Sequence, residues 1–201
     1  MSSPAHVVLL CGPSGSGKSH LAARSGLPVF RLDDFYKDGD DPSLPFSAEL
    51  GIVDWDDPRA WHGDVSVASL VELCGGGAVQ VPAYDIGTSR TVGSSTFDRG
   101  TAPAVVAEGV FAAEIIEQCR EHGILADAVV LHRAPWKNFV RRFIRDLLER
   151  RKPPRTLWHR GRVLMRTESA LVAAAEARGC RRVSAAELTV LLTRLSSQVD
   201  A

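Results

Sequence analysis

Eight consecutive residues near the N-terminus have the types and spacing of a loop that binds a polyphosphate. They are Gly12, Pro13, Ser14, Gly15, Ser16, Gly17, Lys18 and Ser19, which fit the pattern GxxxxGK[ST] in full. Glycines let backbone N–H groups converge on phosphate oxygens, and a following helix adds its positive N-terminal dipole. We expect Lys18 to reach the β- and γ-phosphates and the Ser19 hydroxyl to bind Mg²⁺. The pattern predicts a nucleotide site without separating a kinase from a GTPase or a motor ATPase.

Two adjacent carboxylates, Asp33 and Asp34, follow the next predicted strand. In a P-loop fold the end of that strand lies across the cleft from the γ-phosphate. A carboxylate there could accept the proton of an attacking hydroxyl. Either aspartate could instead cap a turn. The residue types favour phosphoryl transfer to a hydroxyl, with one aspartate as the base.

Basic residues crowd the stretch from Arg133 to Arg166, and two of them, Arg142 and Arg145, are three residues apart in a predicted helix. Residues at this spacing share a helix face, and guanidinium groups offer planar, multi-donor contacts to phosphate. A hinged basic helix would also exclude water, which is the competing acceptor. We expect a helical, arginine-rich lid over residues 136–166, and the alternative is a solvated basic helix face.

Six short blocks in this order make the chain resemble the uridine kinase family, within the wider group that includes phosphoribulokinase and pantothenate kinase. Besides the phosphate loop, the blocks are Asp33–Tyr36, Trp55–Trp61, Val81–Asp85, Ala107–Val110 and Arg141–Asp146. The resemblance implies a P-loop NTPase fold with ATP as the donor and Mg²⁺ as a cofactor. It also implies a small-molecule acceptor, with uridine or a similar nucleoside as the leading expectation.

On the acceptor side, the resemblance assigns roles to four residues. Asp33 matches the aspartate that activates the acceptor hydroxyl, and Tyr36 matches an aromatic residue lining the nucleoside pocket. Asp56 matches the carboxylate that holds the ribose hydroxyls, and Tyr84 matches the tyrosine beside the base. The structural alternatives are a loop or capping aspartate at Asp56 and a half-buried edge aromatic at Tyr84. Because Asp57 stands before a proline, it is the better cap, which leaves Asp56 free.

On the donor side, Glu108 matches an acidic group around the magnesium ion, although a glutamate at a strand end can also simply bond a nearby loop. Arg142, Arg145 and Arg150 match lid arginines that close over the phosphates. Arg142 is therefore expected to touch both the transferred phosphate and the acceptor.

One segment departs from the family pattern. Uridine and cytidine kinases usually carry a histidine a few residues after the pocket tyrosine, where it helps to read the pyrimidine edge. Here the run from Tyr84 to Arg90 is one residue shorter and has no histidine. The loss of a hydrogen-bonding group from a buried pocket alters discrimination substantially, so the identity of the acceptor stays open.

Apolar runs that alternate with helical patterns predict βαβ units and a parallel sheet. The expected fold is therefore α/β: a P-loop NTPase fold with about five parallel strands between helices, in a single domain over residues 1–201. A shorter extended segment is expected at Ala78–Pro82. The five strands are expected at His6–Cys11, Pro28–Leu32, Ala104–Ala107, Asp127–His132 and Cys180–Val183.

Helix signals flank these strands. Asp57 before Pro58 indicates an N-cap, and the run from Ser184 to Glu187 indicates a capping box. Trp61 and Trp136 are predicted to pack rather than to bind a base. The first helix of the lid region should present an apolar face made of Trp136, Phe139, Val140, Phe143 and Leu147, with arginines on its other side.

The composition limits the partners and the compartment. Formal net charge is zero, so no global field would recruit nucleic acid or an acidic membrane. No stretch approaches the length of a membrane span, and the four separated cysteines fit reduced thiols in the cytoplasm. We expect a cytoplasmic protein without nucleic-acid or membrane partners, and the sequence does not indicate an oligomeric state.

Three functions fit these observations. The first is a nucleoside kinase, and the second is a kinase of the same architecture for another alcohol, such as a sugar phosphate, pantothenate or a cofactor precursor. The third is an ATP-binding regulatory protein without turnover, against which the intact Lys18, Ser19, Asp33 and Glu108 argue.

Overall fold

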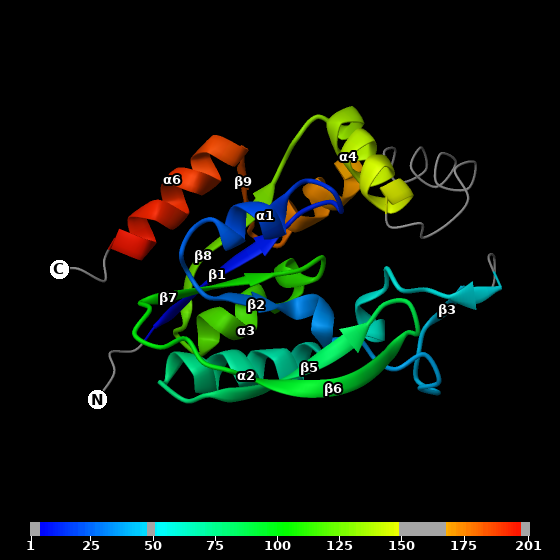
Figure 1. The fold of residues 1–201 in the computed structure, drawn as a ribbon, viewed down its shortest axis with the longest axis horizontal. Helices are drawn as coiled ribbons and strands as arrows, with labels where there is room; N and C mark the ends of the chain where they lie inside the picture. Colours follow the sequence, from blue (N-terminus) through cyan, green and yellow to red (C-terminus); the bar gives the residue numbers. More distant parts are fainter. Residues whose placement is uncertain (1–4, 48–50, 149–167, 198–201) are drawn as a thin grey trace.

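The computed structural model describes residues 5–47, 51–148 and 168–197, and its centre is a five-stranded parallel sheet (Figure 1). All pairings between its strands are parallel, so their carboxyl ends lie at one edge. The predicted strands are confirmed, with ends that differ by a few residues. In spatial order they are β2 (Val29–Arg31), β7 (Ala104–Glu108), β1 (His6–Cys11), β8 (Leu125–Leu131) and β9 (Arg181–Val183).

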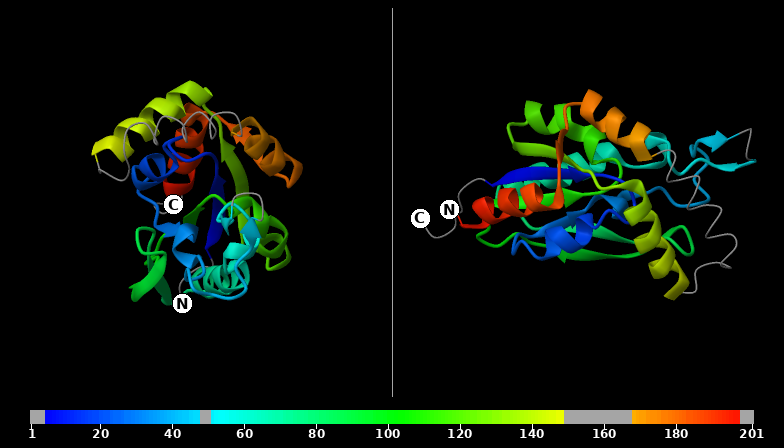
Figure 2. Two further views of the ribbon diagram at one scale, coloured as in Figure 1. Left: turned by 90° about the vertical axis from the view of Figure 1, so that its right-hand side faces the viewer. Right: turned by 90° about the horizontal axis from the view of Figure 1, so that it is seen from above.

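Helices cover both faces of this sheet (Figure 2). β1 alternates, with Val7, Leu9 and Cys11 in one hydrophobic cluster and Val8 and Leu10 in the other. A strand buried on both faces reads as a continuous apolar run, which is why β1 was predictable. The first cluster includes residues of α2 (Gly63–Cys74) and α3 (Ile116–Glu121), and the second includes residues of α1 (Lys18–Ala23) and α6 (Ala185–Ser196).

Two antiparallel hairpins lie outside the central sheet. β5 (Val79–Asp85) pairs with β6 (Arg90–Phe97), and β3 (Phe46–Ser47) pairs with β4 (Ile52–Val53). The sequence predicted part of β5 but missed β6. Nearly all of β6 is exposed, so its residues show no alternation of apolar and polar types.

α4 (Pro135–Leu148) is the first helix of the predicted lid region, but its predicted apolar face is only partly buried. Phe139 and Phe143 stack with ring centroids 5.9 Å apart. Trp136 and Val140, in contrast, are 60% and 41% exposed. The prediction that Trp136 packs is therefore wrong, because α4 turns this edge away from the body of the protein.

The buried contact of α4 is polar. Asn138 is fully buried, and its Nδ2 donates to Oε2 of Glu168 at 2.9 Å. Glu168 belongs to a helix, described over residues 168–177, that the sequence analysis did not predict. This hydrogen bond fixes the first half of α4, while residues 149–166 of the predicted lid lie outside the described residues.

Two predicted helix caps are present. Oδ1 of Asp57 accepts from the backbone N of Arg59 at 2.8 Å and opens the 3-10 turn η2 (Pro58–Ala60) rather than a longer helix. Ser184 and Glu187 form the predicted capping box of α6, with the Ser184 backbone N donating to Glu187 Oε2 at 2.7 Å. Such caps satisfy backbone donors that a helix start leaves unpaired.

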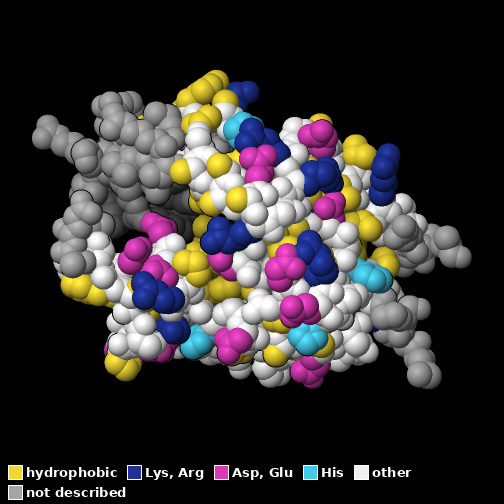
Figure 3. Space-filling view, turned by 180° about the vertical axis from the view of Figure 1, so that it is seen from behind, with side chains coloured by type: hydrophobic (Ala, Val, Ile, Leu, Met, Phe, Trp, Pro, Cys, Tyr) yellow, Lys and Arg dark blue, Asp and Glu magenta, His cyan; other side chains and the backbone are white. Residues whose placement is uncertain are grey.

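Acidic and basic side chains are interspersed on the face shown in Figure 3, so this face offers no continuous field of one sign. Among the described residues, no helix has both the length and the apolar character needed to cross a bilayer.

Trp61 anchors the turn that follows β2. It is 6% exposed, and its Nε1 donates to the carbonyl oxygen of Leu32 at 2.8 Å. We expect Trp61→Phe to lower the free energy of unfolding by about 1–3 kcal/mol, because a buried carbonyl loses its donor. Urea unfolding followed by far-UV circular dichroism measures the loss. Trp136→Phe, at a 60% exposed site, is the matched control, and equal losses in the two variants would contradict the prediction.

Candidate active site

The predicted phosphate loop runs from the end of β1 into α1, and its backbone requires glycine. Gly12 and Gly17 have φ values of 144° and 93°, which residues with side chains rarely adopt. A Cβ on Gly12 would also lie 2.8 Å from the carbonyl oxygen of Leu131 at the end of β8. Nζ of Lys18 donates to the carbonyl oxygen of Gly12 at 2.7 Å. The lysine ammonium thus lies against the loop that we predict to bind phosphate.

Ser16, within this loop, is fully buried, and its Oγ has no hydrogen-bond partner in the part of the chain that the structure describes. Buried hydroxyl groups are normally satisfied. Ser19 lies in the first turn of α1 and is exposed. The loop therefore carries one unsatisfied hydroxyl and one accessible hydroxyl, as a site completed by a polar ligand would.

The sheet register places two acidic residues at the same edge as the loop. Glu108, the last residue of β7, is paired with Leu10 of β1 on one side and with Arg31 of β2 on the other. Gly12 and Asp33 each stand two residues beyond those partners. The phosphate loop, Asp33 and Glu108 therefore meet at the carboxyl edge of the sheet, where ligands bind in open α/β sheets.

Asp33 lies in the 3-10 turn η1 (Leu32–Phe35), and the chain leaving β7 fixes one of its oxygens. The backbone N of Val110 donates to Oδ1 of Asp33 at 3.1 Å. A Cβ on Gly109 would lie 2.8 Å from the same oxygen, so only glycine allows this approach. Oδ2 has no hydrogen bond within the described ranges and is left for a further partner.

Asp34, the other aspartate of the pair, is tied to a local ion pair. Its Oδ1 lies 3.6 Å from Nη2 of Arg31. Burial raises the pKa of Asp34 above the ordinary aspartate value, Arg31 opposes the rise, and the charges of Asp33 and Glu108 add to it. Three carboxylates therefore lie within electrostatic reach of one another, and Asp34 is the one with a neighbouring cation.

The four residues predicted for the acceptor side gather around Tyr36. Burial raises the pKa of Tyr36 above the ordinary tyrosine value, and the neighbouring Asp33, Asp56 and Tyr84 raise it further. The rings of Tyr36 and Tyr84 have centroids 5.9 Å apart. The Tyr36 hydroxyl donates to the carbonyl oxygen of Trp55 at 3.4 Å. Residues from η1, the loop before η2 and β5 thus converge beside Asp33.

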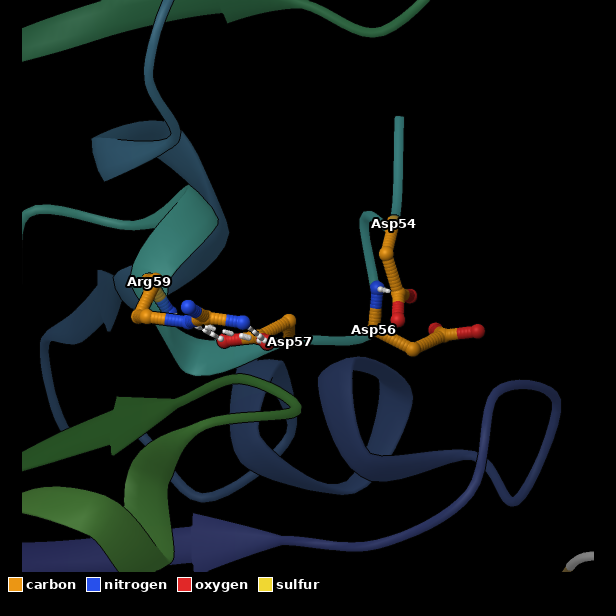
Figure 4. Close-up of polar contacts among 4 residues, drawn as sticks. All are labelled: Asp54, Asp56, Asp57 and Arg59. Carbon is orange, nitrogen blue, oxygen red and sulfur yellow. Dashed lines mark hydrogen bonds and ion pairs between the residues drawn. The ribbon is translucent and has the colours of Figure 1, made fainter. Parts of the chain in front are cut away.

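Asp57 caps the turn η2, as the sequence predicted, and the Asp56 carboxylate takes no part in this cap (Figure 4). The carboxylate of Asp57 binds Arg59, with its Oδ2 2.6 Å from Nη2. The backbone N of Asp56 donates to Oδ1 of Asp54 at 3.1 Å, while the Asp56 carboxylate points away from the Asp57–Arg59 pair. Asp56 is therefore available to a ligand near Tyr36.

The segment that lacks the family histidine forms the tip of the β5–β6 hairpin. The Tyr84 hydroxyl donates to the carbonyl oxygen of Lys37 at 3.1 Å, and Nη2 of Arg90 lies 2.6 Å from Oδ2 of Asp40. Oδ1 of Asp85 accepts from the backbone N of Gly87 at 3.0 Å and closes the turn. The hairpin tip is therefore fastened to the loop after η1 by its own polar groups.

Glu108 fits a metal site in its chemistry. It is 6% exposed, and no hydrogen bond or ion pair of its carboxylate is found among the described residues. A buried charge without a partner is costly. Within those residues no cluster of three or more His, Cys, Asp or Glu side chains could hold a metal. Mg²⁺ commonly takes one or two carboxylates and completes its shell with phosphates and water, so Glu108 and Ser19 could hold it together with a nucleotide.

The predicted lid arginines fall partly outside the description. Arg142 and Arg145 belong to α4, but their side chains, and all of Arg150, lie outside the described residues. Sequence analysis missed Arg141, whose Nη1 lies 3.2 Å from the position that a Cβ on Gly17 would take. Two consecutive arginines in a helix point to different sides. The Arg141–Arg142 pair therefore indicated that one arginine could face the loop, and only the fold shows that Arg141 does.

Two open hollows flank the aromatic residues rather than the phosphate loop. One, of about 310 Å³, lies beside Tyr36 and has Asp38, Asp41 and His62 in its wall. The other, of about 360 Å³, lies beside Tyr84 between β2 and the β5–β6 hairpin. The walls of these two hollows include neither Asp33 nor the phosphate loop.

Gly109→Ala tests the close approach that positions Asp33. The added methyl group would lie 2.8 Å from both Asp33 Oδ1 and Leu32 Cβ, so η1 must shift, and we expect a loss of about 1–3 kcal/mol in unfolding free energy. Urea unfolding measures it. Gly93→Ala on exposed β6, where the methyl group meets nothing within 4 Å, should change stability by less than about 0.5 kcal/mol. Similar values for both variants would contradict the packing argument.

Comparison with known proteins gives a likeness in sequence and in fold. No protein-family model matches the chain. The chain is 30% identical over 115 residues to the uridine kinases of Staphylococcus aureus strains JH9 and Newman, which covers 54% of this chain and 54% of those proteins. It thus spans about half the length of the curated relatives it matches.

Among solved structures, the chain is similar to the "putative fructose transport system kinase" from Silicibacter sp. TM1040. The TM-score is 0.60 and the identity 17%, over 90% of this chain and 89% of that one. At this identity the likeness concerns the fold alone, and this chain has a five-stranded parallel sheet with a glycine-rich loop between β1 and α1. The chain therefore has a P-loop NTPase fold, and over about half of its length its sequence is uridine kinase-like.

Proposed function

We propose that the protein is a kinase, an ATP- and Mg²⁺-dependent phosphotransferase that moves the γ-phosphate to a hydroxyl of a small molecule. One observation carries the proposal: the Asp33 carboxylate is fixed at the sheet edge that also bears the phosphate loop. Nucleotide binding alone does not require a carboxylate there. Phosphoryl transfer does require a group that orients the attacking hydroxyl and takes its proton. The similarity to uridine kinases supports the same conclusion.

In this proposal Asp33, Ser19 and Glu108 act from their observed places, and Lys18 changes its partner. Val110 holds one oxygen of Asp33, so the other accepts the proton of the acceptor hydroxyl. Lys18 leaves the Gly12 carbonyl and neutralises charge on the β- and γ-phosphates. Ser19 and Glu108 hold Mg²⁺, which supplies further charge neutralisation when bound. Positioning and charge neutralisation are the main contributions in this chemistry.

The remaining predicted roles complete the donor side. Arg142, Arg145 and Arg150 are proposed to close over the phosphates, with Arg142 also touching the acceptor. Their closure would exclude water, which competes with the acceptor hydroxyl.

The leading acceptor is a nucleoside such as uridine, phosphorylated at its 5′-hydroxyl. Asp56 would hold the ribose hydroxyls, and Tyr36 and Tyr84 would flank the base. The support is their convergence beside Asp33 together with the names of the relatives.

A different alcohol is the second candidate, and the β5–β6 hairpin favours it. Asp85 and Arg90 fasten the hairpin tip to its own turn and to the loop after η1. No histidine stands in this segment to read a pyrimidine edge. Because hydrogen bonds to the acceptor decide discrimination, a sugar phosphate or a cofactor precursor could replace the nucleoside.

Asp33→Asn tests the proposed base. We expect kcat to fall by about 10²–10⁴-fold, because the amide cannot take the proton, while the ATP affinity stays within a few-fold. A coupled assay for ADP release and calorimetric titration with ATP measure the two quantities. Asp34→Asn is the matched control: it removes a neighbouring carboxylate that pairs with Arg31, and it should retain most activity. Undiminished turnover in Asp33→Asn would rule out the assignment.

A thermal-shift screen with a non-hydrolysable ATP analogue and Mg²⁺ identifies the acceptor. A ligand at about 100 times its Kd adds about 2.7 kcal/mol to the stability, which raises the melting temperature by several degrees. We expect a nucleoside to do so and then to drive ADP release from ATP. A response only to other alcohols would favour the second candidate. Tight ATP binding without transfer to any acceptor would instead indicate a regulatory protein.

A further inference from the structure

Two arginines outside the predicted set stand at the phosphate-loop end of the sheet. Arg133 follows β8, whose last residue, Leu131, is in close contact with Gly12. Arg141 reaches the other end of the loop from α4, with its Nη1 3.2 Å from the position that a Cβ on Gly17 would take. Burial lowers the pKa of Arg133, and the charge of Arg141 lowers it further. The two guanidinium groups are therefore electrostatic neighbours.

Neither group is neutralised by the residues that the structure describes. Nε of Arg133 is buried without a hydrogen-bond partner, and Arg141 makes no hydrogen bond or ion pair there. By comparison, Arg59, Arg90 and Arg182 each lie 2.6 Å from a carboxylate oxygen. Arg133 is half-buried and Arg141 is exposed, and two like charges close together repel each other unless an anion lies between them.

The scaffold holds both groups in place. The buried hydrogen bond between Asn138 and Glu168 fixes α4 one turn before Arg141, and residues three apart lie on the same helix side. Arg133 stands two residues after the end of a central strand. An arginine pair kept unpaired on rigid elements is pre-organised for a ligand.

We propose that Arg133 and Arg141 bind the phosphate chain of the donor nucleotide, in addition to the lid arginines Arg142, Arg145 and Arg150. The inference rests on the proposed function, because it takes the loop to hold a polyphosphate. Guanidinium groups suit this task, since they present planar forks of N–H donors to phosphate oxygens. Bound phosphate would relieve the repulsion within the pair and satisfy Nε of Arg133.

The test measures binding without an acceptor. Calorimetric titrations with ATP and with inorganic tripolyphosphate would be made on the wild type, Arg133→Gln, Arg141→Gln and the double variant. Each single change should weaken both ligands roughly 10- to 100-fold, as expected for the loss of a charged hydrogen bond, and should reduce the salt dependence of binding. Arg182→Gln, which breaks the exposed pair between Arg182 of β9 and Glu176, is the matched control and should bind both ligands like the wild type.

Three results bear on the proposal in distinct ways. Without ligand, the melting temperature of either variant should be equal to or above that of the wild type, because one of two repelling charges is gone. Wild-type affinity in both single variants would overturn the inference and leave the kinase proposal standing. A loss of affinity for ATP but not for tripolyphosphate would do the same, because it would indicate contacts to the nucleoside part of ATP. A wild type that binds neither ligand would overturn both.

Discussion

The hydrogen bond from the backbone N of Val110 to the Asp33 carboxylate joins the two strand ends on which the candidate site depends. It is possible only because Gly109 has no side chain, since a Cβ there would collide with the carboxylate. The backbone N of Gly109 also donates to the carbonyl oxygen of Leu10, just before the phosphate loop. One short segment after β7 therefore connects the loop, the proposed base and the buried Glu108.

Apart from the Arg31–Asp34 pair, four charged side chains near this edge of the sheet have no ion pair in the described part of the chain. Asp33 and Glu108 have no neutralising ion pair on one side, and Arg133 and Arg141 have none on the other, within the ranges that the structure describes. The formal net charge of the chain is nevertheless zero. Separated charges of this kind are costly unless a ligand meets them. A polyphosphate with its metal would neutralise both sides at once, which is how the geometry supports phosphoryl transfer.

Local patterns made the sheet and the loop predictable, whereas contacts between distant segments did not. The apolar run of β1 and the glycine spacing of the loop each consist of residues that are adjacent in the sequence, so both can be recognised without the fold. β6 was missed because exposed hairpin strands have no apolar alternation. The exposure of Trp136 and the approach of Arg141 to Gly17 depend on how α4 docks through Asn138. No periodicity within α4 specifies that orientation.

In the proposed enzyme the phosphate loop and Asp33 face each other across the site of phosphoryl transfer. A crystal structure with Mg²⁺ and a non-hydrolysable ATP analogue tests it most directly. We predict the terminal phosphate between Lys18 and Asp33, with room for one acceptor oxygen about 3–3.5 Å from the phosphorus. A terminal phosphate held away from Asp33, or bound outside the loop from Gly12 to Ser19, would contradict the account.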